Sequence, residues 1–180
     1  MQAIAESEHR PLRSIGASAC DVTASTSALL AELFEFQSVR IFIGTRPLGT
    51  DLPRVSHAVS SGQGLVLVES VLWPPGDYEV EFDGRVYCDG VYTGQTVAHL
   101  ATATRLWRQI LPRGHQVRAL VIVYSEGGGR MTLPAGGRGD VAWVRPEGAV
   151  PAICRLGMEG KRDVNRRALA TLIAATSVQG

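Results

Sequence analysis

Lysine is almost absent from this chain of 180 residues, in which Lys161 is the single lysine among 18 basic residues and the others are arginines. If the protein uses a catalytic lysine, that residue must be Lys161. The formal net charge is only +1, which excludes the global attraction to nucleic acid or anionic lipid that a strongly basic protein has. The arginine bias, in a chain rich in alanine, glycine and valine, is typical of a GC-rich bacterial genome.

Cysteines are also scarce, and Cys20, Cys88 and Cys154 form no C-x-x-C pair. We interpret them as reduced core thiols of a cytoplasmic protein. The N-terminal stretch "MQAIAESEHRPLRS" lacks the apolar core of a signal peptide. No segment approaches the roughly 20 apolar residues of a membrane helix. The sequence therefore predicts a cytoplasmic protein without a membrane partner.

The hydrophobic fraction of 45% is enough for one good core, so we expect a single domain over residues 23–180 after a loosely ordered segment, 1–22. Leu29, Leu30, Leu33 and Phe34 form one apolar stripe of a predicted helix. Spacing and β-branched content then predict, in chain order, a helix over 25–37, strands over 39–43, 54–60 and 64–72, a hairpin from 77, a helix over 95–111, a buried strand over 116–124, a short strand over 141–144, and helices near 147–156 and 162–175.

This order predicts an α/β (α+β) fold with a mixed sheet flanked by helices. In the hairpin, a two-residue loop would put Phe82 opposite Arg85. A three-residue loop over 83–85 would put Phe82 opposite Val86 and Val80 opposite Cys88. We predict this bulged hairpin because it keeps one face apolar. The glycine-rich stretch over 125–140 lacks the spacing of a phosphate-binding loop, so we interpret it as a flexible connection.

Four stretches follow one another in the order, spacing and apolar pattern of a known family: "RVSHAVSSGQGLVLVESVLW", "GDYEVEFDGRVYCDG", "TVAHLATATRLWRQIL" and "VRALVIVY". From about Val39 to about Thr176 the chain resembles the nuclease-related domain (NERD) family. The resemblance implies a restriction-endonuclease-like core. In that family, two carboxylates at adjacent strand ends hold Mg²⁺ or a similar cation, and a lysine orients the attacking water.

The resemblance assigns the catalytic positions to five residues of this chain. Ser56 stands in place of the aspartate, Glu69 keeps the second carboxylate, and Val71 replaces the lysine. Thr102 stands where a helix glutamine is expected, and His57 retains the histidine that follows the aspartate. A serine hydroxyl is a weak ligand for Mg²⁺ and valine cannot orient water, so the resemblance implies a degenerate catalytic motif. We expect no cofactor, and any metal would bind at Glu69.

Two side chains offer a route to activity nevertheless. Glu32 could supply a second carboxylate, and His57 could favour Mn²⁺ over Mg²⁺, which would make the protein a divergent metal-dependent DNA nuclease. The alternative is that Glu32 lies on the solvent-exposed face of its helix and that His57 has a structural role only. A third hypothesis is a non-catalytic structural subunit of a larger bacterial assembly.

Charged residues are segregated along the chain. The hairpin carries five acids, Asp77, Glu79, Glu81, Asp83 and Asp89, and such a ribbon would repel a phosphate backbone. Two basic groups, Arg105, Arg108, Arg113 and Arg118 together with Lys161, Arg162, Arg166 and Arg167, would bind DNA weakly, contact a partner or form solvated helix faces. Opposite patches also suit docking to a protein partner or a second copy. The sequence thus predicts a degenerate nuclease-related protein that acts as a nucleic-acid-associated or protein-binding module.

Overall fold

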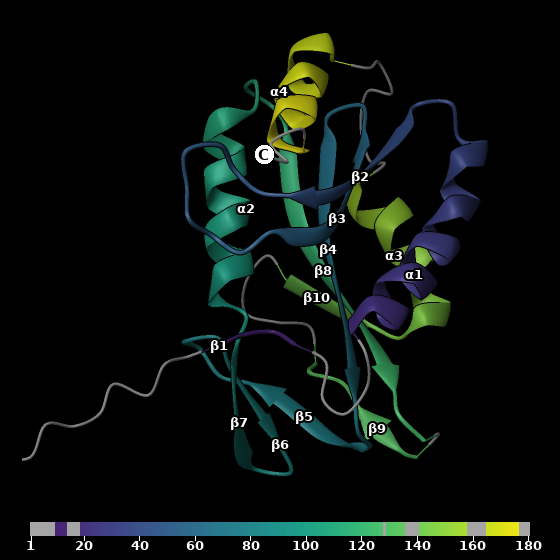
Figure 1. The fold of residues 1–180 in the computed structure, drawn as a ribbon, viewed down its shortest axis with the longest axis vertical. Coiled ribbons are helices and arrows are strands. Elements are labelled where there is room, and N and C mark those ends of the chain that lie inside the picture. Colours follow the sequence, from purple (N-terminus) through teal and green to yellow (C-terminus); the bar gives the residue numbers. More distant parts are fainter. Residues whose placement is uncertain (1–9, 14–18, 128, 136–140, 158–164, 177–180) are drawn as a thin grey trace, which may run out of the picture.

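A computed structural model describes residues 10–13, 19–127, 129–135, 141–157 and 165–176 (Figure 1). In this part of the chain two five-stranded sheets are flanked by four α-helices, which confirms the predicted mixed α/β class. None of the described helices has the length and apolar content needed to cross a membrane.

The central sheet has the strand order β10-β8-β4-β3-β2. Its strands are β2 (Val39–Thr45), β3 (Val55–Ser61), β4 (Gly64–Trp73), β8 (Gln116–Ser125) and β10 (Val141–Val144). β2, β3 and β4 are antiparallel, whereas β4, β8 and β10 run parallel. β8 has a strand on each side and is buried over most of its length, as its continuous apolar run predicted.

Helices cover both faces of this sheet (Figure 1). α2 (Ala98–Ile110) and α4 (Arg166–Thr176) pack on one face, and α1 (Ala19–Leu30) and α3 (Pro146–Gly157) lie over the other. Successive residues of β4 alternate between the two cores because side chains alternate along a strand: Leu67 and Val71 belong to the α2/α4 core, and Val66 and Val68 to the α1/α3 core.

The second sheet was not predicted. It has the order β1-β7-β6-β5-β9 and consists of β1 (Arg10–Pro11), β5 (Gly76–Val80), β6 (Arg85–Cys88), β7 (Val91–Thr96) and β9 (Met131–Thr132). Thus the stretch interpreted as a flexible connection contributes a strand. β1 lies in the segment expected to be loosely ordered, of which residues 1–9 and 14–18 are outside the described residues. Trp73 joins the two sheets by stacking on Tyr78, with ring centroids 4.5 Å apart.

The hairpin register differs from the prediction by two residues. Val80 lies opposite Val86, and Tyr78 lies opposite Cys88. The Glu81 N–H donates to the Arg85 carbonyl at 3.0 Å, so the loop is 82–84 and Phe82 is 89% exposed at its tip. Gly84 explains the shift. It has φ +87°, a conformation that favours glycine, and therefore closes the loop one residue earlier than predicted.

The first helix also differs from the prediction. α1 ends at Leu30 and a 3₁₀ turn, η1 (Ala31–Glu35), follows. The tighter winding of a 3₁₀ turn breaks the 3.6-residue stripe, so Leu33 remains buried while Phe34 is 65% exposed. Cys88 and Cys154 are free thiols but lie at the margins of the two cores, partly exposed rather than inside. The Cys20 side chain lies outside the described part.

Candidate functional site

Ser56 and Glu69, the two positions at which the resemblance implies metal ligands, are brought together by the antiparallel pairing of β3 with β4. The Ser56 N–H donates to Glu69 Oε2 at 3.2 Å. The Ser56 hydroxyl donates to the Val68 carbonyl at 2.8 Å. The hydroxyl hydrogen is therefore used within the sheet, and the carboxylate is held by a backbone N–H.

Glu69 is partly exposed and lies in an apolar setting. Alternation along β4 places it on the α2/α4 face between Leu67 and Val71, both of which are 0% exposed. Burial raises the pKa of the Glu69 carboxyl to about 7, although N–H groups of Ser56 and Ser70 favour its charged form. Near neutral pH this carboxyl therefore carries a proton in a large share of the molecules.

His57 faces the opposite side of the central sheet from Glu69. It lies opposite Val68, a residue of the α1/α3 core, and its Nε2 is 2.8 Å from the Ser27 hydroxyl on α1. His57 is fully buried, and burial lowers the pKa of its imidazole. Its Nδ1 has no hydrogen-bond partner among the described residues. The imidazole thus belongs to the helix-sheet contact beneath α1.

A second polar contact lies in the same layer beneath α1. The Thr26 hydroxyl is 2.7 Å from the Ser70 hydroxyl and 3.0 Å from the Tyr124 hydroxyl, so one helix residue joins β4 and β8. Buried hydroxyls that pair with each other satisfy hydrogen-bonding needs that would otherwise be costly. This layer attaches α1 to the sheet.

Glu32 is not near Glu69 either. It lies exposed on η1, whose Leu33 packs into the α1/α3 core on the opposite side of the sheet. Within the described ranges, no three His, Cys, Asp or Glu side chains gather closely enough to hold a metal ion. The residues at the expected metal position do not fit a hard cation, because Glu69 is alone there, hydrogen-bonded to Ser56 and next to Val71.

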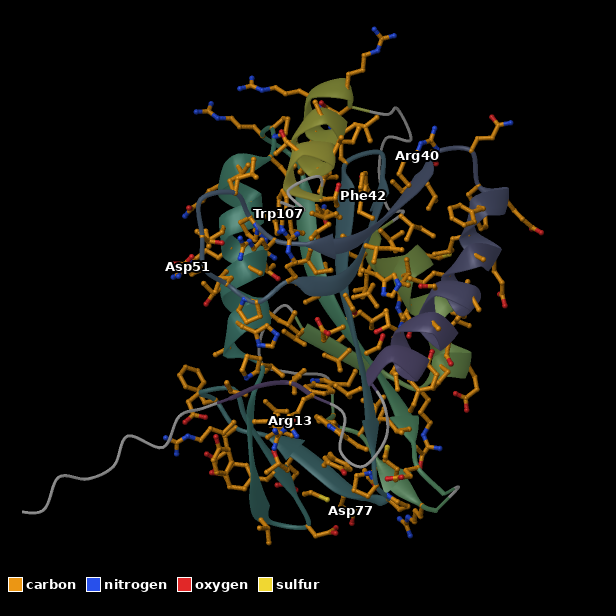
Figure 2. The ribbon with its side chains drawn as sticks, in the orientation of Figure 1. Arg13, Arg40, Phe42, Asp51, Asp77 and Trp107 are labelled. Carbon is orange, nitrogen blue, oxygen red and sulfur yellow. The ribbon has the colours of Figure 1, made fainter. Side chains whose placement is uncertain are left out.

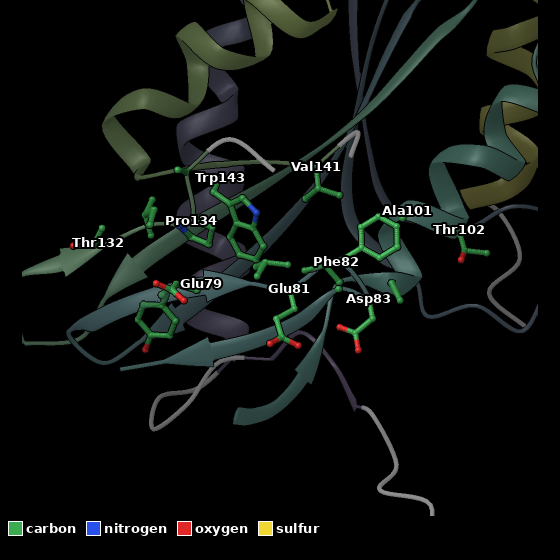
Figure 3. A pocket seen from close by; sticks show the side chains of 17 residues that line it. Glu79, Glu81, Phe82, Asp83, Ala101, Thr102, Thr132, Pro134, Val141 and Trp143 are labelled. Carbon is green, nitrogen blue, oxygen red and sulfur yellow. The ribbon is translucent and has the colours of Figure 1, made fainter. Parts of the chain in front are cut away.

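Thr102, on α2, lines a cavity of about 750 Å³ that the sequence did not reveal (Figure 3). The cavity lies between β5, the first turns of α2, the segment 132–135 and β10. In the close view, Trp143, Pro134 and Val141 lie on one side, and the carboxylates of Glu79, Glu81 and Asp83 lie on the other. Glu69 is not among its lining residues.

Comparisons of the chain with protein-family models, curated proteins and solved structures find no match. The NERD assignment stays a prediction carried by the residues of this chain.

The cavity is acidic. Its lining residues within the described chain include three acidic residues, Glu79, Glu81 and Asp83, and no basic residue. Alternation along β5 places the Glu79 and Glu81 side chains on the face away from Tyr78 and Val80, so their carboxylates lie at the rim of the cavity. Asp83 pairs with Arg85 at 3.0 Å, and Glu81 accepts a hydrogen bond from the Tyr87 hydroxyl at 3.3 Å. The acidic pattern of the hairpin was visible in the sequence. The cavity was not, because its opposite wall comes from residues more than fifty positions further along the chain.

The described residues of the two basic groups that the sequence indicated lie outside the cavity lining. Arg105, Arg108 and Arg113 are exposed on and just after α2, Arg118 is partly buried on β8, and Arg166 and Arg167 are exposed in the first turn of α4. The Arg108 guanidinium donates to the Val117 carbonyl at 2.6 Å. Lys161 and Arg162 lie outside the described residues. Figure 2 shows Asp77 in the second sheet, at the end of the molecule away from α4.

Proposed function

We propose that this chain is a catalytically degenerate, restriction-endonuclease-like module of the NERD type, which binds a partner and does not hydrolyse nucleic acid. The observation that carries this proposal is the environment of Glu69. Its carboxylate accepts the Ser56 N–H at 3.2 Å and lies beside the fully buried Val71. Among the described residues, no amine stands there to orient a water molecule.

Two physical effects oppose a metal-dependent reaction at this position. Hard cations bind in proportion to the negative charge of their ligands, and Ser56 supplies none. A carboxyl with a pKa of about 7 also keeps its proton in competition with a cation near neutral pH. His57 and Glu32 do not compensate, because both lie on the α1/α3 side of the sheet.

A protein partner is favoured over nucleic acid by the charge of the cavity. Glu79, Glu81 and Asp83 line it, and all three are exposed. Such a rim repels a phosphate backbone and attracts a cationic surface. The arginines of α2 and α4 remain as a place for weak contact with DNA.

The proposal is tested by incubating the purified protein with supercoiled plasmid and linear DNA, in Mg²⁺ and then in Mn²⁺. We expect no cleavage that differs between the wild type and Glu69→Ala. Glu35→Ala is the matched control, because it removes an exposed carboxylate of η1, which packs on the other side of the sheet through Leu33. Cleavage that is lost in Glu69→Ala and kept in Glu35→Ala would establish the divergent nuclease instead.

A further inference from the structure

The outer edge of β5 is open where it borders the cavity. On one side β5 pairs with β6 over Tyr78–Val80. On the other side it pairs with β9 only at Gly76 and Asp77. Beyond Asp77, no strand among the described residues lies along this edge. Tyr78, Glu79 and Val80 are all lining residues of the cavity.

Hydrogen bonds show which backbone groups face the open edge. Asp77 accepts from the Asp89 N–H at 2.8 Å and Glu81 donates to the Arg85 carbonyl at 3.0 Å, so the odd-numbered residues are directed toward β6. Gly76 donates to the Arg130 carbonyl at 3.2 Å, in the direction of β9. Backbone groups alternate along a strand, so those of Tyr78 and Val80 are directed away from β6. The parallel pairing of Asp77 with Thr132 uses the Tyr78 N–H, so the Tyr78 carbonyl and both backbone groups of Val80 are directed toward the cavity. A row of such groups is a template for another strand.

Side chains next to this edge define what such a strand would carry. Tyr78 and Val80 pack toward the α2/α4 core. Glu79 and Glu81 alternate with them and are exposed on the other face of the second sheet, at the rim of the cavity. A strand added beside β5 would place alternate side chains beside these two pairs, because side chains of neighbouring strands share faces. Its inward positions therefore suit apolar residues, and its outward positions suit basic residues.

Aromatic side chains near this edge also favour apolar and basic residues in an added strand. Phe82 is 89% exposed at the hairpin tip, and the partly exposed Trp143 lies across the cavity. Arginine stacks well on aromatic faces, and apolar side chains pack against them. The volume of about 750 Å³ is within the range of ligand-binding pockets.

We propose that the cavity is a docking groove for an extended segment of a partner protein, in which basic and apolar residues alternate. The segment adds a strand to β5 beyond Asp77, so that backbone pairing provides affinity and Glu79 and Glu81 select basic side chains. This inference rests on the proposed binding function and names the chemistry of the partner.

The probe is a synthetic peptide of alternating arginine and valine, titrated into the full-length protein by calorimetry. Two control peptides accompany it. One replaces arginine by glutamate, and the other is methylated at alternate backbone nitrogens, which removes the N–H groups that pair with a strand edge. We expect the arginine-valine peptide to bind and both controls to fail.

Exposed residues provide variants that leave the fold intact. The double variant Glu79→Gln, Glu81→Gln should weaken peptide binding about five- to tenfold, with less effect at high salt. Phe82→Ser should weaken it further. Glu32→Gln with Glu35→Gln is the matched control, because it removes the same charge from exposed positions of η1 and should leave binding unchanged.

Three results would overturn the inference: no binding of the arginine-valine peptide, equal binding of the methylated peptide, or equal weakening by the η1 control. Association of two copies through this edge, seen by sedimentation and lost in Phe82→Ser, would also replace it. None of these results bears on DNA cleavage. Conversely, cleavage dependent on Glu69 would overturn the proposed function while leaving peptide binding intact.

Discussion

Replacing Glu69 by glutamine should make the protein more stable at alkaline pH. The amide keeps the shape of the carboxyl and can still accept the Ser56 N–H, but it has no charge to bury. Burial raises the pKa of Glu69 from 4.5 to about 7, so the native state holds a proton that the unfolded chain releases. The contribution of this group to stability is therefore complete below about pH 4.5 and is lost as the pH rises through about 7.

The magnitude follows from the difference between the two pKa values. At about 1.4 kcal/mol per pKa unit, a difference of about 2.5 units corresponds to about 3.5 kcal/mol in total. Between about pH 5 and about pH 8, the free energy of unfolding of the wild type should fall by about 2.5 kcal/mol more than that of Glu69→Gln.

Urea unfolding of both proteins at these two pH values measures the effect. Other titrating groups are shared by the two proteins and cancel in the difference. Glu32→Gln is the control for the loss of one carboxylate at an exposed position. A difference between the wild type and Glu69→Gln that is the same at both pH values would contradict the burial of the Glu69 carboxyl.

Two further changes test the packing on either side of the sheet. Ser27→Ala removes the hydroxyl bonded to His57 Nε2 and leaves a buried ring nitrogen unpaired, so we expect a loss of about 1–3 kcal/mol in chemical denaturation; no loss would show that α1 does not attach there. Gly64→Ala would place a Cβ 1.9 Å from the Gly157 carbonyl oxygen, so α3 must move away from β4. We expect a loss of about 3 kcal/mol or more in thermal unfolding, and a variant as stable as the wild type would contradict the contact.

Local sequence patterns predicted those elements in which the spacing or the run of apolar residues alone indicates which side chains are buried. The stripe of Val97, Leu100, Thr104, Trp107 and Leu111 is buried in and around α2, and the apolar run of β8 lies inside the sheet. The hairpin shows the limit of this approach. Two registers that differ by two residues keep the same face apolar, so the pattern alone did not distinguish them, and the backbone conformation of Gly84 decided between them.

The candidate site was predictable only in part, for a different reason. Alternation along β4 placed Glu69 beside Val71, and this needed no tertiary information. The separation of His57 from Glu69 depends on how β3 pairs with β4, and the cavity depends on segments distant in sequence that meet only in the folded chain. Such contacts have no local signal.

Titration with Mn²⁺ would show whether Glu69 holds a metal ion, which the proposed function denies. At about pH 8 the Glu69 carboxyl is largely ionised, so proton competition no longer hides a site. Titration of the wild type and Glu69→Gln, followed by the electron paramagnetic resonance of free Mn²⁺, compares the two directly. We expect the same weak uptake by both proteins. A Mn²⁺ ion that the wild type binds and Glu69→Gln does not would contradict the proposed function.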